Sequence, residues 1–441
     1  MKPLLSSQKI ILLKMIYAVI YAGIVLVLIV LDQPQSIDTW TYTLGKALGF
    51  LGITSLVVQF VLGSRITWLE RGVGLDRMMR WHKVNAKLAT LFLVIHPGLV
   101  FFGPLLQAGV KLGEIMNFVS VGILLGDAAL ILIFIILVTS LYSTKIKLSY
   151  ERWKWVHKLV YGVIILGFLH SFNVGTEILL KNALFYWWVL LGLSALYAVA
   201  YRYLWRPYQH KQSQYTVTNI IQETPTVRTF MLSPIQKKLQ YMAGQFAFVR
   251  IHAQDLSDEE HSFTISSSPK DEHLSFSIKE SGDYTSQLGN VKEGDVFQVE
   301  GPYGVFSNHD MKGPFLFIAG GIGITPIRSM LRTMAFLENT EKATLLYANR
   351  NMEEIAFYDE LEKLQQDHDW FKLVHILSGE EKDGFYKGYI NADIIKNEMS
   401  DLKNVTIFLV GPPPMMDAVT KELLSLGVSK ANIHTERFAL R

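Results

Sequence analysis

Residues 81–102 read WHKVNAKLATLFLVIHPGLVFF, and residues 156–172 read VHKLVYGVIILGFLHSF. Each stretch is apolar and carries a histidine towards each end, His82 and His96 in the first and His157 and His170 in the second. No other histidine precedes His210. At about 1.5 Å per residue, separations of about 14 and 13 residues span roughly 20 Å of helix. We therefore expect two membrane helices that present two pairs of imidazole ligands, which would suit two b-type haems stacked across a bilayer.

The helical phase of these histidines needs an explanation. On an ideal α-helix, about 14 residues return to within roughly 40° of the same face, whereas about 13 residues miss it by roughly 140°. A distortion near Gly162 or Gly167, or haems approached from different sides, would reconcile the second spacing with ligation. The alternative is that the histidines are polar packing residues, but four of them in two matched pairs favour ligation.

The composition restricts the chemistry that the chain can perform. Half of the 441 residues are hydrophobic, which indicates membrane segments, and the length suits two or three domains. The net charge of +3 gives no indication of nucleic-acid binding. There is no cysteine, which excludes disulfides, cysteine-ligated iron–sulfur clusters, thiol nucleophiles and covalently attached haem. Electron transfer would therefore rely on flavin, nicotinamide and histidine-ligated haem.

Hydropathy predicts six transmembrane helices in the first half of the chain. The expected spans are residues 10–31, 44–62, 84–102, 115–141, 159–173 and 183–204, each near the length that a bilayer requires. The first could instead be a signal peptide. It lacks a small-residue cleavage site before Asp32 and is followed by further spans, so we interpret it as an uncleaved helix.

Loop charge predicts the orientation. Five basic residues lie between positions 65 and 83 and five more between positions 145 and 158, whereas the intervening loops carry chiefly Lys111 and Lys181. The positive-inside rule then places the N-terminus, both basic loops and everything after residue 204 in the cytoplasm. We therefore expect a multi-pass protein of the cell membrane with its soluble domains in the cytoplasm.

This orientation predicts how the histidines pair. His82 and His157 would lie at the cytoplasmic ends of their helices and share an inner haem, and His96 and His170 would share an outer haem. Basic loop residues such as Arg65 and Arg80 could neutralise the propionates of the inner haem. Alternatively, these residues only follow the positive-inside rule and contact anionic lipid.

The second half changes character after a polar linker at residues 206–213. Short alternating runs separated by turn residues predict an antiparallel β-barrel over residues 214–311. Within it, residues 261–268 read HSFTISSS, where small hydroxyls such as Ser266 alternate with apolar side chains. This strand could hydrogen-bond a flavin. Residues 281–288, SGDYTSQL, resemble a loop that enters a helix and could bind a pyrophosphate; the alternative is an ordinary helix cap.

The last segment, residues 312–441, predicts a doubly wound α/β domain. An apolar strand at residues 315–319 leads through the turn GGIGITP, residues 320–326, into a helix. A strand, a glycine-rich turn and a helix in this order form a site for dinucleotide phosphates. The glycine spacing is not the standard GxGxxG. Further strands and helices follow, including a helix expected at residues 353–366. Arg350 ends the second strand and could bind the 2′-phosphate of NADPH, or be a solvated loop arginine.

With these motifs placed, the chain resembles the NADPH oxidase/ferric reductase superfamily, and most of all its stand-alone bacterial NADPH oxidases. The similarity covers nearly the whole chain, with residues 1–205 as a bis-haem ferric-reductase-like domain. In that family, histidines on the third and fifth helices ligate two haems. Its flavin strand, usually His-Pro-Phe-Thr, matches His261, Phe263 and Thr264, with Ser262 in place of proline. The remaining matches, to the phosphate and nicotinamide motifs, are Gly282, Thr285, Ser286, Gly320, Gly321, Gly323, Thr325, Pro326, Gly411, Pro412 and Met415.

The resemblance implies a transmembrane NAD(P)H oxidase. Electrons would pass from cytoplasmic NAD(P)H through FAD and two b-type haems to oxygen on the outer face, giving superoxide, without a regulatory protein subunit. A C-terminal aromatic, here Phe438, would lie against the flavin ring. One alternative keeps the electron path but reduces a ferric chelate or a quinone. The other is a non-catalytic membrane sensor that binds haem and flavin as structural ligands.

Overall fold

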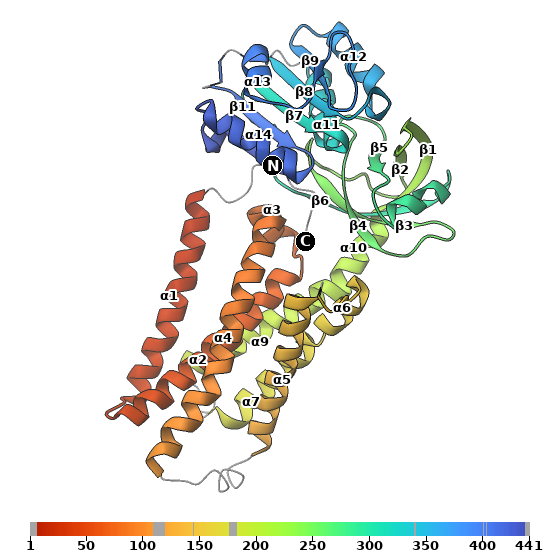
Figure 1. Cartoon of the computed structure of the whole chain (residues 1–441). Coiled ribbons are helices and arrows are strands. Elements are labelled where there is room, and N and C mark those ends of the chain that lie inside the picture. The colour runs from red at the N-terminus through yellow and green to blue at the C-terminus, as the bar shows by residue number, and fades with distance from the viewer. Residues whose placement is uncertain are drawn as a thin grey trace. The chain divides into compact units, whose positions relative to one another are not determined.

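The computed structural model describes residues 7–108, 120–143, 145–175, 183–338, 341–399, 401–402 and 404–436. The chain forms two compact units, which we call the helical unit, Leu5–Trp205, and the sheet unit, Arg206–Arg441. Each is described separately (Figure 1).

The helical unit contains the six predicted transmembrane helices, and this prediction is confirmed. Six of its described helices are long and apolar enough to cross a membrane. Their outward faces carry large exposed apolar side chains such as Val19, Phe134 and Leu196, which are 69%, 65% and 64% exposed. Such faces suit hydrocarbon rather than water. The described helices are α1 (Ser7–Asp32), α2 (Ile37–Gly63), α3 (Thr67–Val73), α4 (Leu75–Ala108), α5 (Val121–Tyr142), α6 (Tyr150–His157), α7 (Val160–Val174) and α9 (Ala183–Ala200), which is continued by the π-helical turn η2 (Tyr201–Trp205).

Local polar residues begin several of these helices. Ser36 forms a capping box with Thr39 at the start of α2, and the side chains of Ser120 and Ser149 accept backbone N–H groups at the starts of α5 and α6. Serine caps satisfy amide groups that have no partner within a helix. The predicted fourth span began at residue 115, but α5 begins at Val121, and residues 109–119 lie outside the described residues.

A polar network attaches α1 to the rest of the bundle. The Tyr17 hydroxyl donates to Asn85 Oδ1 of α4 at 2.6 Å and also bonds Tyr21, whose hydroxyl bonds Ser55 of α2. Asn85 Nδ2 in turn donates to the Ser55 carbonyl at 2.8 Å. Between apolar helices in a membrane, hydrogen bonds of this kind hold neighbours together.

The sheet unit begins with a closed barrel. Its strands are β1 (Gln214–Thr224), β2 (Val227–Pro234), β3 (Phe246–His252), β4 (Glu260–Thr264), β5 (Leu274–Lys279) and β6 (Val296–Tyr303). They pair antiparallel in the order β4-β3-β6-β1-β2-β5, and a bridge between Ile265 and Phe276 joins the two ends. Buried aromatic side chains such as Phe230 and Phe297 fill the interior. Residues 206–213, expected as a linker, are mostly helical, as α10 (Arg206–Gln212).

The rest of the sheet unit is a parallel α/β sheet, which confirms the predicted fold class. The order β10-β9-β8-β7-β11-β12 places β7 centrally, with β8 and β11 on either side. All six residues of β7 are buried, as expected for a strand covered on both faces. The elements are β7 (Phe315–Gly320), α11 (Ile324–Phe336), β8 (Ala343–Asn349), α12 (Tyr358–Asp367), β9 (Phe371–Leu377), β10 (Tyr386–Lys387), α13 (Ala392–Glu398), β11 (Thr406–Val410), α14 (Pro413–Ser425) and β12 (Ile433–Glu436).

One helix boundary was predicted wrongly. The helix expected at residues 353–366 begins only at Tyr358, after a 3-10 turn at Met352–Glu354. Phe357 has a φ of 62°, in the left-handed region, so an α-helix cannot run through it. Ile355 and Ala356 are buried in the core instead, which explains why this apolar stretch interrupts the helical pattern.

Candidate functional site

The structure brings the four histidines of the helical unit together in two pairs. The rings of His82 of α4 and His157 of α6 have centroids 6.2 Å apart. Those of His96 of α4 and His170 of α7 are also 6.2 Å apart. These are the pairings that the loop charges predict.

This spacing suits a metal ion between each pair of rings. Metal–nitrogen bonds of about 2.0–2.1 Å to imidazoles on opposite sides of one ion place the ring centroids roughly 6 Å apart. Among the described residues, no group of three or more His, Asp or Glu side chains could hold a metal ion. Each pair therefore offers two protein ligands, which is the number that a six-coordinate haem iron takes from its protein.

Backbone carbonyls orient the rings of the His96/His170 pair. Nδ1 of His96 donates to the Gly45 carbonyl and Nδ1 of His170 donates to the Gly122 carbonyl, both at 2.7 Å. Because a carbonyl only accepts, Nδ1 carries the proton in both rings, and Nε2 keeps the lone pair that binds a metal.

Two glycine pairs allow this close approach, and we call each pair a glycine notch. One is Gly45 and Gly49 of α2, and the other is Gly122 and Gly126 of α5. A Cβ at Gly49 would lie 3.0 Å from Nδ1 of His96, and one at Gly126 would lie 2.7 Å from Nδ1 of His170. Small residues four apart let neighbouring membrane helices approach closely. Sequence reasoning missed these glycines, although their Gly-x-x-x-Gly spacing could have identified them.

The surroundings of the His82/His157 pair are different. Nδ1 of both rings is buried and has no hydrogen-bond partner in the described part of the chain. The Gln59 carbonyl lies near His82 without reaching hydrogen-bond geometry to Nδ1. Trp153 stacks on His157 with ring centroids 4.9 Å apart.

An unpredicted arginine accompanies this pair. Nη1 of Arg202 donates to the Gly63 carbonyl at 3.3 Å, and a Cβ at Gly63 would lie 3.4 Å from His82 Cε1. The sequence had suggested Arg65 and Arg80 as basic partners of this site, and Arg80 is exposed. Arg202 was overlooked because it belongs to the last helix of the unit and not to either basic loop.

A helix break removes the difficulty of the 13-residue separation. α6 ends at His157 and α7 begins at Val160, and the Lys158 amide bonds the carbonyls of Lys154, Trp155 and Val156. His157 and His170 therefore do not share one continuous helix, and the ideal-helix angle between them does not apply. The distortion lies N-terminal to the predicted positions, Gly162 and Gly167.

In the barrel, the expected flavin strand is β4 and the residues that follow it. The His261 ring stacks on Tyr284 with centroids 3.8 Å apart, and its Nε2 is 3.1 Å from a Glu259 carboxylate oxygen. Phe263 lies beyond His261 at a centroid distance of 6.2 Å. Thr264 ends the strand and is buried.

Ser266 and its neighbours join the barrel to the α/β sheet. The Ser266 hydroxyl is buried and donates to the Ser275 carbonyl at 3.1 Å, so it is bonded within the barrel. Its own carbonyl accepts from Arg328 of α11 at 3.0 Å, and the Ser267 carbonyl accepts from Ser329 at 2.5 Å. Ser266 was predicted to belong to a polar strand edge that binds flavin. It contributes to the contact between the barrel and the α/β sheet, and flavin binding by Ser266 stays a prediction.

The expected phosphate loop is compact. Thr285–Asn290 forms a six-residue 3-10 helix, not an α-helix. The Thr285 hydroxyl accepts from the amides of Ser281 and Gly282 at 2.9 and 3.1 Å, and the Ser286 hydroxyl donates to the Asp283 carbonyl at 3.0 Å. These contacts close the loop on itself without a side-chain cap at the start of the 3-10 helix, and binding of a pyrophosphate by Gly282, Thr285 and Ser286 stays a prediction.

The two glycine turns predicted for nicotinamide binding meet at the sheet's switch point. They follow β7 and β11, which are adjacent parallel strands whose connections lead to opposite sides of the sheet. A Cβ at Gly320 would lie 2.4 Å from Met415 Sδ and 2.9 Å from Pro412 Cδ, and one at Gly323 would lie 3.1 Å from Gly411 Cα. Ligands of doubly wound sheets bind in the crevice at this point.

The other predicted nicotinamide residues lie around this crevice or beyond it. Thr325 and Pro326 are buried in the first turn of α11, and the Thr325 hydroxyl donates to the Ile322 carbonyl at 3.1 Å. Gly321 is partly exposed, and Arg350 is exposed directly after β8. Phe438 lies outside the described residues.

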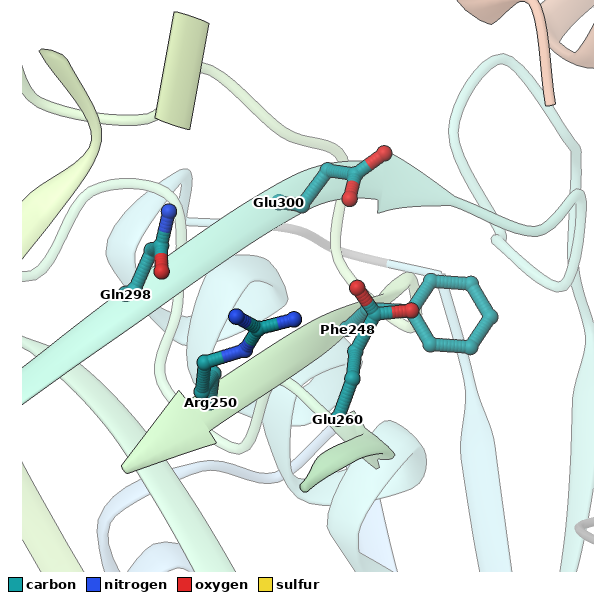
Figure 2. Close-up of a pocket in the computed structure, with 5 residues that line it drawn as sticks. All are labelled: Phe248, Arg250, Glu260, Gln298 and Glu300. Atoms are coloured by element: carbon teal, nitrogen blue, oxygen red, sulfur yellow. The ribbon is translucent and has the colours of Figure 1, made fainter. Parts of the chain in front are cut away.

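Sequence reasoning also missed an ion-pair cluster on the barrel. Arg206 of α10 bonds Glu300 of β6 through Nε at 2.6 Å and through Nη2, and its Nη2 also lies 3.2 Å from Glu260 of β4. Figure 2 shows Glu260 and Glu300, together with Arg250, among the residues that line a pocket on the barrel. The cluster holds α10, in the segment that was expected to be a polar linker, against the barrel.

Three family models match the chain. They are a ferric reductase like transmembrane component at residues 48–168, an FAD-binding domain at residues 216–307 and an oxidoreductase NAD-binding domain at residues 317–421. Together they cover the helical unit, the barrel and the α/β sheet in that order.

Curated relatives share about half of the chain. The glycine betaine monooxygenase reductase subunit of Pseudomonas aeruginosa is 34% identical over 230 residues, which are 50% of this chain and 62% of that protein. The 2-halobenzoate 1,2-dioxygenase electron transfer component of Burkholderia cepacia is 28% identical over 216 residues, 48% of this chain and 62% of that protein. Each match thus spans less than two thirds of the relative's own length.

A solved structure is similar as well. The flavohem-like FAD/NAD binding domain of nitric oxide dioxygenase from Vibrio cholerae has 26% identity and a TM-score of 0.48, covering 51% of this chain and 97% of that one. The order of the three family models along one chain is decisive for classification. A ferric-reductase-like membrane component followed by FAD- and NAD-binding domains makes this chain a member of the NADPH oxidase/ferric reductase superfamily.

Proposed function

We propose that this chain is a transmembrane NAD(P)H oxidase. It passes electrons from cytoplasmic NAD(P)H through FAD and two b-type haems to oxygen on the outer face of the cell membrane, giving superoxide. The observation that carries the proposal is the presence of two histidine pairs inside the membrane helices, each with its ring centroids 6.2 Å apart.

The cofactors supply the redox chemistry, because a bound flavin accepts hydride and releases single electrons, and bound haem carries single electrons. The chain's own residues position these groups. His82 and His157 would hold one haem, and His96 and His170 the other. The carbonyls of Gly45 and Gly122 keep Nε2 of His96 and His170 free for iron.

The sheet unit would bind the remaining two cofactors. The strand that carries His261 and Thr264 would hold the flavin, and the switch point between β7 and β11 would hold the nicotinamide nucleotide. Arg350, exposed directly after β8, would bind a 2′-phosphate, which favours NADPH. Phe438 would lie against the flavin ring, as the family resemblance implies.

The decisive measurement is the reduced-minus-oxidised spectrum of the purified, haem- and FAD-loaded protein after anaerobic addition of NADPH. We expect b-type haem reduction by NADPH, followed by reoxidation on admitting oxygen with superoxide-dismutase-sensitive reduction of cytochrome c. Flavin reduction without haem reduction would contradict the proposed path and favour a non-catalytic haem.

Haem content tests the ligands directly. His96→Leu should halve the haem per protein while FAD content is unchanged, because one of two sites loses an axial ligand. His309→Leu, which replaces an exposed histidine of the sheet unit, is the matched control and should bind both haems. Full haem content in the His96→Leu protein would refute the assignment.

Reduction of a ferric chelate is a second candidate, because the model that matches the helical unit describes a ferric reductase like component. The two activities separate under strict anaerobiosis. If NADPH-dependent reduction of a ferric chelate then equals or exceeds the superoxide rate in air, ferric iron is the better acceptor and the oxidase proposal fails.

A further inference from the structure

The two histidine pairs differ in the hydrogen bonds that their Nδ1 atoms make. In the His96/His170 pair, each Nδ1 donates a hydrogen bond of 2.7 Å to a backbone carbonyl. In the His82/His157 pair, neither Nδ1 has a hydrogen-bond partner in the described part of the chain, although both atoms are buried. Identical ligand types thus have different surroundings within one bundle.

The glycine notches produce this difference. In each notch, the first glycine supplies the carbonyl, and the glycine four residues later leaves room for the ring to reach it. His82 faces a related arrangement on α2, with the Gln59 carbonyl and then Gly63. A Cβ at Gly63 would lie 3.4 Å from His82 Cε1, so this ring lies less close to the helix backbone.

A cationic side chain lies next to the His82/His157 pair. Nη1 of Arg202 donates to the carbonyl of Gly63, the glycine that faces His82. Its guanidinium stays charged under all ordinary conditions. A nearby positive charge stabilises the reduced form of a metal centre, since that form carries one more electron.

Hydrogen bonding acts in the opposite direction at the other pair. A ligating imidazole that donates its second N–H to a strong acceptor becomes a more basic ligand. A more basic ligand stabilises Fe(III) relative to Fe(II) and so lowers the reduction potential. Hydrogen bonding around the ligands is one of the means by which proteins set haem potentials.

We propose that the glycine notches make the His96/His170 site the lower-potential haem site of this protein. The inference rests on the proposed occupancy of both pairs by haem. It goes beyond that proposal by assigning an order of reduction. If haem fills both pairs, the iron held by His82 and His157 would be reduced first when one electron is supplied per molecule, and the iron held by His96 and His170 would stay oxidised. Onward transfer would then depend on the acceptor that removes the electron from the second site.

Potentiometric measurement of the full-length, haem-loaded protein tests this order. We expect two one-electron waves in the haem absorbance. Single-site proteins assign them, because His82→Leu leaves the His96/His170 site loaded and His96→Leu leaves the His82/His157 site loaded. The lower wave should persist in the His82→Leu protein and the upper wave in the His96→Leu protein. Coincident waves or the reverse assignment would overturn the inference.

Glycine variants test the cause. Gly49→Ala and Gly126→Ala insert a methyl group 3.0 and 2.7 Å from the Nδ1 atoms, which should push the rings off their carbonyls. The lower wave should then move to higher potential while the upper wave stays in place. Gly167→Ala is the matched control, because its Cβ would meet Ile53 at 3.8 Å and no histidine, so neither wave should move.

The outcomes distinguish this inference from the proposed function. A wild-type protein that binds no haem, or one whose haem content is unchanged in His96→Leu, refutes the function and the inference together. Two bound haems with equal potentials refute the inference alone. If the glycine variants fail to fold, the wild-type and single-site potentials still decide the order.

Discussion

Gly323 offers a direct test of the nicotinamide site. It lies in the turn between β7 and α11, and an added Cβ would stand 2.8 Å from the Val410 carbonyl oxygen and 3.1 Å from Gly411 Cα. These are backbone atoms of the last residue of β11 and the first residue of the turn that follows, so they cannot rotate away as a side chain could. In a Gly323→Ala protein the two turns must move apart.

The expected magnitude follows from the cost of overpacking. Extra methyl groups in a well-packed region typically cost roughly 1–3 kcal/mol. If the strain is relieved by widening the crevice between the turns, the loss appears in nucleotide binding. At about 1.4 kcal/mol per tenfold change, NADPH affinity should fall roughly 5- to 150-fold. FAD content should be unchanged, because the barrel does not contain this contact.

The assay is stopped-flow reduction of the bound flavin at increasing NADPH concentration, with FAD content measured by absorbance. Gly289→Ala is the matched control in the barrel. Its Cβ would meet Nη1 of Arg228 at 3.0 Å, the movable end of a long side chain, so little cost is expected. Unchanged NADPH affinity and an unchanged unfolding temperature in Gly323→Ala would refute the close contact of the two turns as a determinant of binding.

Two further predictions concern stability. Burial, with a smaller contribution from Lys382, lowers the pKa of His375 to about 4, and a Glu362 carboxylate oxygen lies 3.3 Å from its Nε2. The unfolded chain, with a histidine pKa of about 6.5, binds more protons between these values, so the free energy of unfolding should fall by up to about 3 kcal/mol from pH 7 to pH 4. His375→Phe should flatten that dependence in urea unfolding, and equal slopes in both proteins would contradict it. Arg206→Met removes the cation that pairs with the largely buried Glu300 carboxylate and should cost roughly 3–5 kcal/mol, seen as a lower unfolding temperature of the FAD-loaded protein. An unchanged temperature would show that the cluster is dispensable.

The elements that the sequence predicted correctly depend on local signals. Six apolar segments of bilayer length need no knowledge of their neighbours, and the continuous apolar strand before Gly320 indicates a buried parallel strand on its own. The helix boundary at Phe357 was missed because a left-handed residue leaves no trace in the apolar pattern. The bond of the Ser266 hydroxyl to the Ser275 carbonyl could not be predicted, because the sequence alone does not reveal the pairing of the strand that carries Ser275.

The glycine notches depend on non-local contacts, yet their numbering follows a simple rule. In two packed antiparallel helices, the residue numbers of facing positions have a constant sum. For α2 and α4 the facing pairs are Gly45 with Val100, Gly49 with His96 and Gly63 with His82, and each pair sums to 145. Had α2 been paired with α4 in this register, the 14-residue repeat of the histidines would have pointed to its glycines.

The same rule explains why His157 is exceptional. For α5 and α7, Gly122 faces Val174 and Gly126 faces His170, and both pairs sum to 296. A continuous helix would place His157 opposite Thr139, where a side chain would obstruct the approach that glycine permits at the other site. Instead the helix is interrupted between α6 and α7, so His157 does not follow the α5/α7 register and lies against His82. The break that brings the ring to its partner therefore also deprives it of a backbone carbonyl, which is why the two sites have different hydrogen bonding.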